Sequence, residues 1–324
     1  MFAQSALRDA LAAVSDGPVE VATIAPIEAG TNRAYRLRLA DETDRVLKVG
    51  TRFPDAFPAE PETMALVRRV TTLPVPRVYG TGTEPLGYPF TVYEYVPGTD
   101  HRWVGELPTR AADRLCREAG AHLRELHRIR FERFGALGMA DEAEDGLSVV
   151  DPAPPRTVLR RSLDRQLAEL RETPFADRVS ALDALGADLI DRIDTERVEP
   201  TLVHGDYRLE NLCIDPAADR ITTAVLDWER PTSFDPLWDA VMASALLADG
   251  YRLDPEARRS LRGAFWDAYG DGADGTPRRR CYELLARIRL ARHLDTEMRG
   301  EPDAAVTERS AEHEAAFEAM LESH

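Results

Sequence analysis

The chain has 324 residues, of which 44% are hydrophobic, and it carries a formal net charge of −16 at pH 7 with a pI near 5.0. This length is sufficient for two lobes, and no apolar run reaches the roughly 18 residues that a membrane span requires. An acidic chain without a basic stripe is a poor partner for nucleic acid. Its three distant cysteines indicate neither a disulfide framework nor a zinc site, so we expect a cytoplasmic protein without nucleic-acid or membrane partners.

The first part of the chain is predicted to form a helix followed by strands. Residues 1–17 have the pattern of a short amphipathic helix, and residues 19–49 alternate as strands do. Gly30, Thr31 and Asn32 interrupt the first two strands. A loop of small residues there can place backbone N–H groups over phosphates, although one glycine between strands is equally typical of a hairpin turn.

Lysine occurs only once in this chain. Of the 41 basic residues, all except Lys48 are arginine. This pattern indicates that position 48 needs a property that arginine cannot supply, and a compact, flexible ammonium set against phosphate is such a property. Lys48 falls on the predicted strand that follows the turn at residues 41–44, beside the small-residue loop.

A helix is predicted from Pro58 to about Val70. Proline within the first turn costs no helical hydrogen bond, and acidic residues suit the positive end of a helix. Two of its carboxylates have the reach to pair with Lys48, and we prefer Glu60 to Glu62.

The run from Thr91 to Gly98 reads as a buried strand that ends in a Pro-Gly turn. In a protein of two lobes this segment is a natural linker, whose backbone near Glu94 and Val96 can pair with the edge of an adenine. An ordinary strand and turn fits these residues equally well. We place the division at this point, with an N-terminal nucleotide-binding lobe of residues 1–96 and a helical catalytic and substrate lobe of residues 97–324.

Helical periodicity dominates after residue 98, and strand patterns nearly vanish. Helices are predicted within residues 110–127, 156–194, 238–248, 255–269, 278–298 and 304–324, and residues 135–151 are predicted to be a loop. His122 and His127 lie on a mostly apolar helix without a third ligand, so we interpret them as packing residues and not as a metal site.

The segment from Leu202 to Asp239 carries the strongest chemical signal. It contains HGDYRLEN at residues 204–211, and a second apolar run delivers Asp227 at its end. The H-x-D-x-x-x-x-N spacing is that of the catalytic loop of kinases, where the aspartate serves as base and the asparagine binds a metal ion. Asp206 is thus the candidate base, and Asn211 and Asp227 are candidate ligands of Mg²⁺.

Each of these residues also has a structural alternative. Asp206 and Asn211 could be simple turn or capping residues. Asp235 is better explained as a helix cap, because Pro236 suits the first position of a helix. Asp239 could be a charge on a helix surface, although we favour a buried anchor for the loop.

These motifs together resemble the aminoglycoside phosphotransferase family, also described as choline-kinase-like, of protein-kinase-like enzymes. The matching segments are AGTN (29–32), VLKV (46–49), AEPETMALV (59–67), LPVPRVYG (73–80), YEYVPG (93–98), HGDYRLEN (204–211), LDWE (226–229) and DPLWD (235–239). The resemblance implies an α+β fold of two lobes: a small N-terminal lobe with an antiparallel sheet and one helix, and a larger, mostly helical C-terminal lobe.

The same resemblance implies roles for individual residues. A nucleotide, ATP or GTP, would lie between the lobes, with Lys48 on its phosphates and Glu60 pairing that lysine. Asp206 would be the base, and Asn211 and Asp227 would hold Mg²⁺. His204 and Asp239 would support the loop.

The sequence therefore predicts a small-molecule kinase that phosphorylates a hydroxyl group. Only seven residues separate Asp227 from Asp235, which leaves no room for the activation loop of a protein kinase. The alternative is a non-catalytic nucleotide-binding regulatory module of the same fold. We expect a monomer or homodimer. Residues 141–145 or the acidic tail would suit a polycationic acceptor, but the acidity is spread over the whole chain, so the acceptor stays open.

Overall fold

An antiparallel sheet forms the core of the N-terminal lobe. The computed structural model describes residues 2–15, 17–28, 30, 32–98, 101–139, 146–270 and 275–323. The five strands of this sheet, in the order β1-β2-β3-β5-β4, are β1 (Val21–Ile27), β2 (Arg33–Leu39), β3 (Asp44–Val49), β4 (Val78–Gly82) and β5 (Phe90–Glu94). The predicted alternation holds in β2, where Tyr35, Leu37 and Leu39 are buried.

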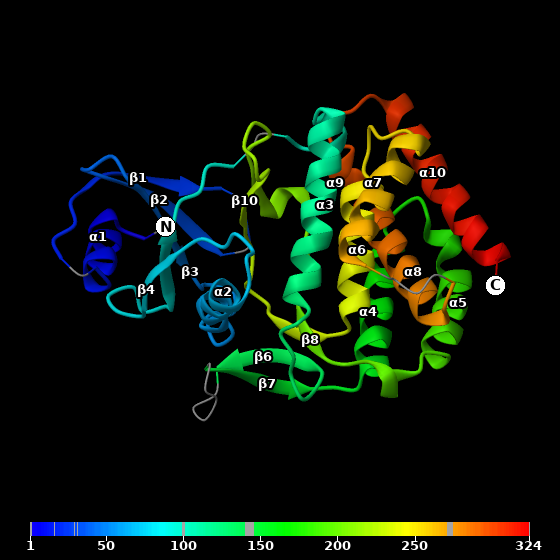
Figure 1. The fold of residues 1–324 in the computed structure, drawn as a ribbon, viewed down its shortest axis with the longest axis horizontal. Helices are drawn as coiled ribbons and strands as arrows, with labels where there is room; N and C mark the ends of the chain where they lie inside the picture. Colours follow the sequence, from blue (N-terminus) through cyan, green and yellow to red (C-terminus); the bar gives the residue numbers. More distant parts are fainter. Residues whose placement is uncertain are drawn as a thin grey trace.

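The described part of the N-terminal lobe carries two helices. The family resemblance implied one helix in this lobe. Helix α1 (Gln4–Ala13) is the predicted amphipathic segment, and it packs Leu7 and Leu11 against the buried face of the sheet. Helix α2 (Ala59–Val70) begins after Pro58 as predicted. Its buried Met64 and Val67 join the core of the C-terminal lobe, so α2 connects the two lobes (Figure 1).

The C-terminal lobe is mainly helical, as predicted (Figure 1). Its described helices are α3 (Thr109–Leu126), α4 (Pro155–Leu170), α5 (Val179–Asp191), α6 (Pro236–Ala248), α7 (Pro255–Tyr269), α8 (Pro277–Arg292), α9 (Leu294–Glu297) and α10 (Asp303–Glu322). Short 3-10 turns lie at η1 (Val104–Glu106), η2 (Ala176–Arg178), η3 (Thr195–Arg197) and η4 (Leu209–Asn211). The apolar stripe of α3 is buried against α7, on the side of the helical lobe that faces the N-terminal lobe (Figure 1).

The prediction of a loop at residues 135–151 is wrong for its described part. Strands β6 (Gly135–Met139) and β7 (Leu147–Pro152) form an antiparallel hairpin in a four-stranded sheet of order β7-β6-β11-β8. Strands β8 (Thr201–Val203) and β11 (Thr232–Phe234) complete it. β6 pairs with a strand about a hundred residues further along the chain, and local composition cannot report such a partner.

A second small sheet carries the loops of interest. Strands β9 (Leu212–Ile214) and β10 (Thr222–Val225) pair antiparallel, and β10 corresponds to the second apolar run of the central segment. β9 begins directly after Asn211 and β10 ends just before Asp227, so the two candidate metal ligands lie at the same end of one hairpin.

Residues 95–98 connect β5 to the C-terminal lobe without regular structure. We keep the division at residues 96 and 97 as a proposal, because α2 belongs to the first part of the chain and yet shares a core with α3. Within the described ranges, no helix is both long and apolar enough to cross a membrane.

Candidate active site

Lys48 lies on the central part of the N-terminal sheet and pairs with α2. Strand β3 lies between β2 and β5, so Lys48 is flanked by Ala34 and Thr91. Its Nζ lies 2.8 Å from Oε1 of Glu60, and both side chains are buried. Of the two carboxylates considered for this pair, Glu60 is the one that makes it.

A further carboxylate reaches Lys48 from the C-terminal lobe. Glu229 Oε2 lies 3.3 Å from Nζ of Lys48 and accepts a hydrogen bond of 2.8 Å from Nδ2 of Asn32. Oδ1 of Asp227 lies 3.9 Å from the same Nζ. Lys48 therefore faces Asp227 across the space between the lobes, and Asn32 and Glu229 join the small-residue loop to the segment that carries Asp227.

Burial and charge oppose each other in this cluster. Burial alone would lower the pKa of Lys48, but the charges of Glu60, Tyr93 and Glu229 outweigh it and the pKa is raised. Desolvation raises the pKa of Glu60 despite Lys48. Desolvation, followed by the charge of Glu229, likewise raises the pKa of Asp227, although Lys48 opposes this. The cluster thus holds more carboxylates than its one ammonium can balance, and an additional cation would stabilise it.

Asp227 also has a special backbone. Its φ of 66° lies in the left-handed region, which is uncommon for a residue other than glycine and is tolerated best by Asn and Asp. Leu226, just before it, donates its N–H to the carbonyl of Asn211 at 2.8 Å. The turn therefore directs Asp227 out of the hairpin, and such local strain often accompanies a functional site.

The loop at residues 204–206 is held by Asp239 from beneath. This buried carboxylate of α6 accepts the backbone N–H of His204 at 2.7 Å and that of Gly205 at 2.8 Å. The His204 ring accepts from the backbone N–H of Asp206 through Nδ1, at 3.2 Å, and its Nε2 lies 2.9 Å from the carbonyl oxygen of Leu226. Since an amide can only donate and a carbonyl can only accept, the contacts assign the proton to Nε2. The ring thereby ties the Asp206 loop to the Asp227 turn.

Both oxygens of Asp206 have partners. Nδ2 of Asn211 donates to Oδ2 of Asp206 at 3.0 Å and to its carbonyl at 2.9 Å. Oδ1 accepts from Nη2 of Arg289, a residue of α8, and lies 3.2 Å from Nε of Arg208. Because Asn211 uses its amide nitrogen on Asp206, its Oδ1 is the atom left to serve as a metal ligand.

A family model described as the phosphotransferase enzyme family matches residues 23–285. The chain belongs to this family. The match covers parts of both lobes, including Lys48, Glu60, Asp206, Asn211 and Asp227, and it confirms the family resemblance and the prediction of a small-molecule kinase.

Two animal proteins match parts of this phosphotransferase. Acyl-CoA dehydrogenase family member 10 of Mus musculus is 29% identical over 248 residues, which cover 72% of this chain and 21% of the mouse protein. Acyl-CoA dehydrogenase family member 11 of Gallus gallus is 26% identical over 172 residues, which cover 53% of this chain and 20% of the chicken protein. The chain thus spans about a fifth of the length of these curated relatives.

Solved structures confirm the predicted fold. A Ralstonia eutropha protein named as a candidate aminoglycoside phosphotransferase superposes with a TM-score of 0.68, at 21% identity over 99% of this chain and 98% of the other. Macrolide 2′-phosphotransferase from Brachybacterium faecium gives 0.59 at 22% identity over 98% and 97%. A thermostable mutant of aminoglycoside phosphotransferase APH(4)-Ia, in ternary complex with ADP and hygromycin B, gives 0.59 at 18% identity over 94% of each chain.

The remaining predicted site residues of the phosphotransferase lie in the loop before β2, at the end of β5 and in the linker after it. Gly30 has a left-handed φ of 91°, which suits glycine, while Thr31 beside it lies outside the described residues. Glu94 Oε2 accepts the backbone N–H of Arg77 at 3.1 Å, so its side chain is already engaged. The carbonyl of Val96 lies 3.5 Å from Sγ of Cys213 on β9, which puts the linker against the C-terminal lobe.

The supporting residues behave as predicted. Asp235 is buried and caps α6 by accepting the N–H of Leu237 at 2.8 Å. His122 Nδ1 lies 2.8 Å from the hydroxyl of Tyr207, and His127 lies between Asp239 and the hydroxyl of Tyr269. Both histidines therefore tie α3 to the loop and to α6, as packing residues.

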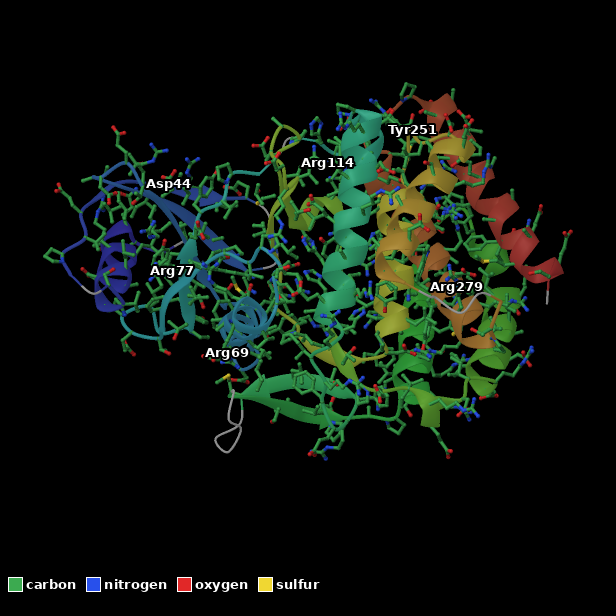
Figure 2. All side chains as sticks on the ribbon, viewed as in Figure 1. Asp44, Arg69, Arg77, Arg114, Tyr251 and Arg279 are labelled. Atoms are coloured by element: carbon green, nitrogen blue, oxygen red, sulfur yellow. The ribbon has the colours of Figure 1, made fainter. Side chains whose placement is uncertain are left out.

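Two residues of this site were missed. Glu229 stood in the quoted LDWE segment, and its place two residues after Asp227 was a usable signal. Arg289 carried none, because it is one of many arginines and contacts Asp206 across 83 positions of sequence. Figure 2 shows other arginines, such as Arg69, Arg114 and Arg279, spread over both lobes.

No group of three His, Cys, Asp or Glu side chains able to hold a metal lies within the described ranges. Mg²⁺ needs only one or two protein carboxylates when phosphate oxygens complete its shell. The oxygen donors of Asn211 and Asp227 fit that requirement, and the surplus of carboxylates near Asp227 fits a cation.

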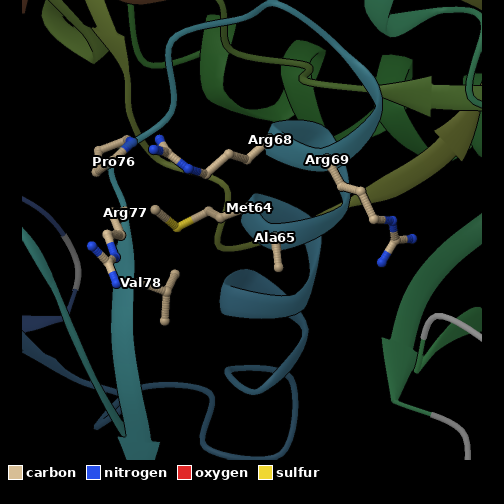
Figure 3. A pocket seen from close by; sticks show the side chains of 7 residues that line it. All are labelled: Met64, Ala65, Arg68, Arg69, Pro76, Arg77 and Val78. Carbon is tan, nitrogen blue, oxygen red and sulfur yellow. The ribbon is translucent and has the colours of Figure 1, made fainter. Parts of the chain in front are cut away.

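Two surface pockets lie away from this cluster. One, of about 370 Å³, lies between α2 and the start of β4, where Arg68 and Met64 face Arg77 and Val78 (Figure 3). The other, of about 450 Å³, lies between α4 and α5. Neither contains a predicted site residue, and the acidic residues 141–145 lie outside the described chain.

Proposed function

We propose that this phosphotransferase moves the terminal phosphoryl group of ATP or GTP to a hydroxyl of a small molecule, with Asp206 as the base. One observation carries the proposal. Lys48 on the N-terminal sheet lies 3.9 Å from Asp227 on the C-terminal hairpin, next to the loop on which Asn211 holds Asp206. A cation for phosphate, two oxygen donors for a metal and a carboxylate base therefore converge from both lobes.

The residues have distinct tasks in this proposal. Lys48 binds the phosphates as a point charge, and Glu60 keeps the ammonium oriented. Asn211 and Asp227 hold Mg²⁺, which supplies positive charge to the transferred phosphoryl group. Asp206 accepts the proton of the acceptor hydroxyl, and His204 and Asp239 keep its loop in position. Catalysis of this kind depends mainly on positioning and on charge stabilisation.

The nucleotide is proposed to lie between the lobes. Structural neighbours were solved with ADP, with AMP-PNP and with GDP, so both adenine and guanine nucleotides occur with this fold. In this chain, the backbone at Gly30 and Asn32 would cover the phosphates. The backbone of Glu94 and Val96 would pair with the base.

Other features remain proposals from the sequence alone: a monomer or homodimer, the absence of nucleic-acid and membrane partners, and a cytoplasmic location.

Neighbouring structures contain hygromycin B or kanamycin. A small-molecule acceptor is therefore proposed for this chain, but hygromycin B and kanamycin themselves are not proposed as its acceptors.

Nucleotide turnover by Asp206→Asn tests the proposed function. We expect Mg²⁺-dependent release of ADP or GDP by the wild type in the presence of a panel of sugars, amino alcohols, hydroxy acids and antibiotics. Loss of the base should lower turnover by about 10²- to 10⁴-fold, while nucleotide affinity measured by calorimetry stays the same. Asp191→Asn, an exposed change on α5, is the matched control.

The non-catalytic alternative makes the opposite prediction. A binding module would bind nucleotide, and its turnover would not fall when Asp206 is changed. If wild-type turnover never exceeds that of Asp206→Asn, with both proteins folded, the proposed enzyme is ruled out.

A further inference from the structure

Arginine side chains surround Asp206 on its C-terminal side. Arg289 donates to Oδ1 of Asp206 through Nη2 and to the carbonyl of Gly205 through Nη1 at 2.9 Å. Arg208, two residues after Asp206, holds its Nε 3.2 Å from the same Oδ1. The proposed base thus has guanidinium groups as immediate neighbours in a chain whose net charge is −16.

The last turn of α8 extends this basic environment. Residues three and four positions apart lie on one face of a helix, so Arg292 and His293 follow Arg289 on the same side. Arg292 forms an ion pair with Glu169 of α4. Burial, and then the charges of Arg292, Arg289 and Arg208, lower the pKa of His293 to about 4, against the opposing effect of Asp206. The guanidinium groups of Arg208, Arg289 and Arg292 therefore make the surroundings of His293 electropositive.

Two of these guanidinium groups retain buried, unused donors. The Nε atoms of Arg208 and Arg292 are buried and have no hydrogen-bond partner in the described part of the protein. For Arg208, Oδ1 of Asp206 is within reach but not aligned for a hydrogen bond. Buried donors are nearly always satisfied in folded proteins, so these two donors, of which that of Arg208 lies beside the proposed base, favour an acceptor that binds in this region. Within the described residues, Arg258 and Arg287 also retain an unpartnered Nε, and among these four arginines Arg208 contacts Asp206.

The carboxylates of this region occupy only some of the guanidinium donors. Glu210 approaches Nη1 of Arg208 only to 3.9 Å, and its side chain is mostly exposed. Glu169 takes one edge of Arg292, and its side chain is about half exposed. A guanidinium has five N–H donors in a planar fork that matches a carboxylate or phosphate. The same charges would repel the ammonium groups of a polycation.

We propose that the acceptor is a hydroxyl compound that carries an anionic group, a carboxylate or a phosphate, which Arg208 and Arg292 bind beside Asp206. This inference rests on the proposed function. In the reaction, the acceptor hydroxyl gives its proton to Asp206 as its oxygen forms a bond to the terminal phosphorus. The bond from that phosphorus to the bridging oxygen breaks, and the nucleoside diphosphate leaves with the electron pair. Arg289 stays with Asp206 and Gly205 as a positioning residue.

Acceptors matched in length and different in charge test this inference. Short hydroxy acids and phosphorylated alcohols are compared with the corresponding hydroxy amides and amino alcohols, at saturating nucleotide and Mg²⁺. KM and kcat come from nucleoside diphosphate release. Calorimetry in the presence of AMP-PNP and Mg²⁺ measures binding without turnover. Comparing the hydroxy acids with the phosphorylated alcohols shows whether the site binds a carboxylate or a phosphate.

Arg208→Gln and Arg292→Gln remove the proposed contacts. We expect the wild type to prefer an anionic acceptor over its amide by at least about tenfold in KM, and each variant to lose that preference. The KM for nucleotide should change by less than about twofold, because Lys48 and Glu60 belong to the other lobe. Arg292→Lys keeps the charge and should recover part of the affinity. Arg197→Gln, on the exposed turn η3, is the matched control.

Several outcomes would overturn the inference. These are a preference of the wild type for amides or amino alcohols, equal KM values in the folded variants, and no calorimetric binding of any anionic member below about 10 mM. Failure of the proposed function looks different, because the wild type would then release no nucleoside diphosphate with any acceptor or with water. In that case the binding data still decide whether the site selects anions.

Discussion

Asp239→Asn is the most informative single change outside the proposed chemistry. The substitution keeps the shape of the side chain and removes its charge. It also replaces one acceptor oxygen by an NH₂ donor, next to the backbone N–H groups of His204 and Gly205, which can only donate. Asp239 accepts from the backbone of His204 and Gly205 at 2.7 and 2.8 Å, and its Oδ2 lies 3.2 Å from Nε2 of His127.

The structure suggests a large effect on stability. Asp239 is 1% exposed, so no water replaces a lost partner. Breaking one side of a buried charged network costs about 3–5 kcal/mol. For a protein of this size, that loss should lower the melting temperature by roughly 4–7 °C.

The effect should depend on pH in a defined direction. Burial by itself would raise the pKa of Asp239, but the hydrogen bond and charge of His127 outweigh it, with help from His204, and the pKa is lowered. A carboxylate with a lowered folded pKa stabilises the protein fully above its unfolded pKa of about 3.9. The stabilisation is lost as the pH falls through the folded value. The stability difference between wild type and Asp239→Asn should therefore shrink below about pH 4.

Activity gives a second measurement of the same change. A loosened loop misplaces Asp206, so kcat should fall by about 10²-fold. The KM for nucleotide should stay nearly constant, because Lys48 and Glu60 belong to the other lobe. Urea unfolding, melting curves and steady-state kinetics measure these effects, with Asp191→Asn as the control. A variant that melts within 2 °C or so of the wild type and keeps its kcat would refute the role of Asp239 as anchor.

Three further changes test other parts of the site. Lys48→Arg should raise the KM for nucleotide or lower kcat by at least about tenfold while melting changes little, and unchanged kinetics would remove the argument from the single lysine. Gly205→Ala should cost roughly 1–2 kcal/mol in urea unfolding, because Gly205 has a φ of 74° and a Cβ there would lie 3.3 Å from the ring of Trp238. Chelation with EDTA should abolish turnover and added Mg²⁺ should restore it. Full activity in EDTA would contradict the proposed roles of Asn211 and Asp227.

Much of the site could be predicted because its signals are local. The interval from His204 to Asn211 sets one turn, and the next strand ends just before Asp227. The cap at Asp235 follows from the proline after it. Glu60 and Glu62 could be singled out as candidate partners of Lys48 because both carboxylates lie in the first turn of one predicted helix, within the reach of a lysine side chain.

The failures are all long-range. The hairpin of β6 and β7 escaped prediction because β6 completes its pairing with β11, which no neighbouring residue reports. Glu229 had a local signal, its place two residues after Asp227, but its contact with Asn32 spans 197 positions and appears only in the folded chain. Arg289 could not be singled out among the many arginines before the fold brought α8 against the loop.

The sequence by itself thus determined the family, the two-lobe fold and the residues that resemble a phosphoryl-transfer site. These follow from short spacings and from secondary-structure patterns, which depend on residues close together in the chain. Only the tertiary structure decided what surrounds Asp206. It brought Arg289 and Arg208 to the carboxylate and left donors of Arg208 and Arg292 unsatisfied. Net charge cannot report such an arrangement, because an acidic total says nothing about the sign of the charge beside one residue.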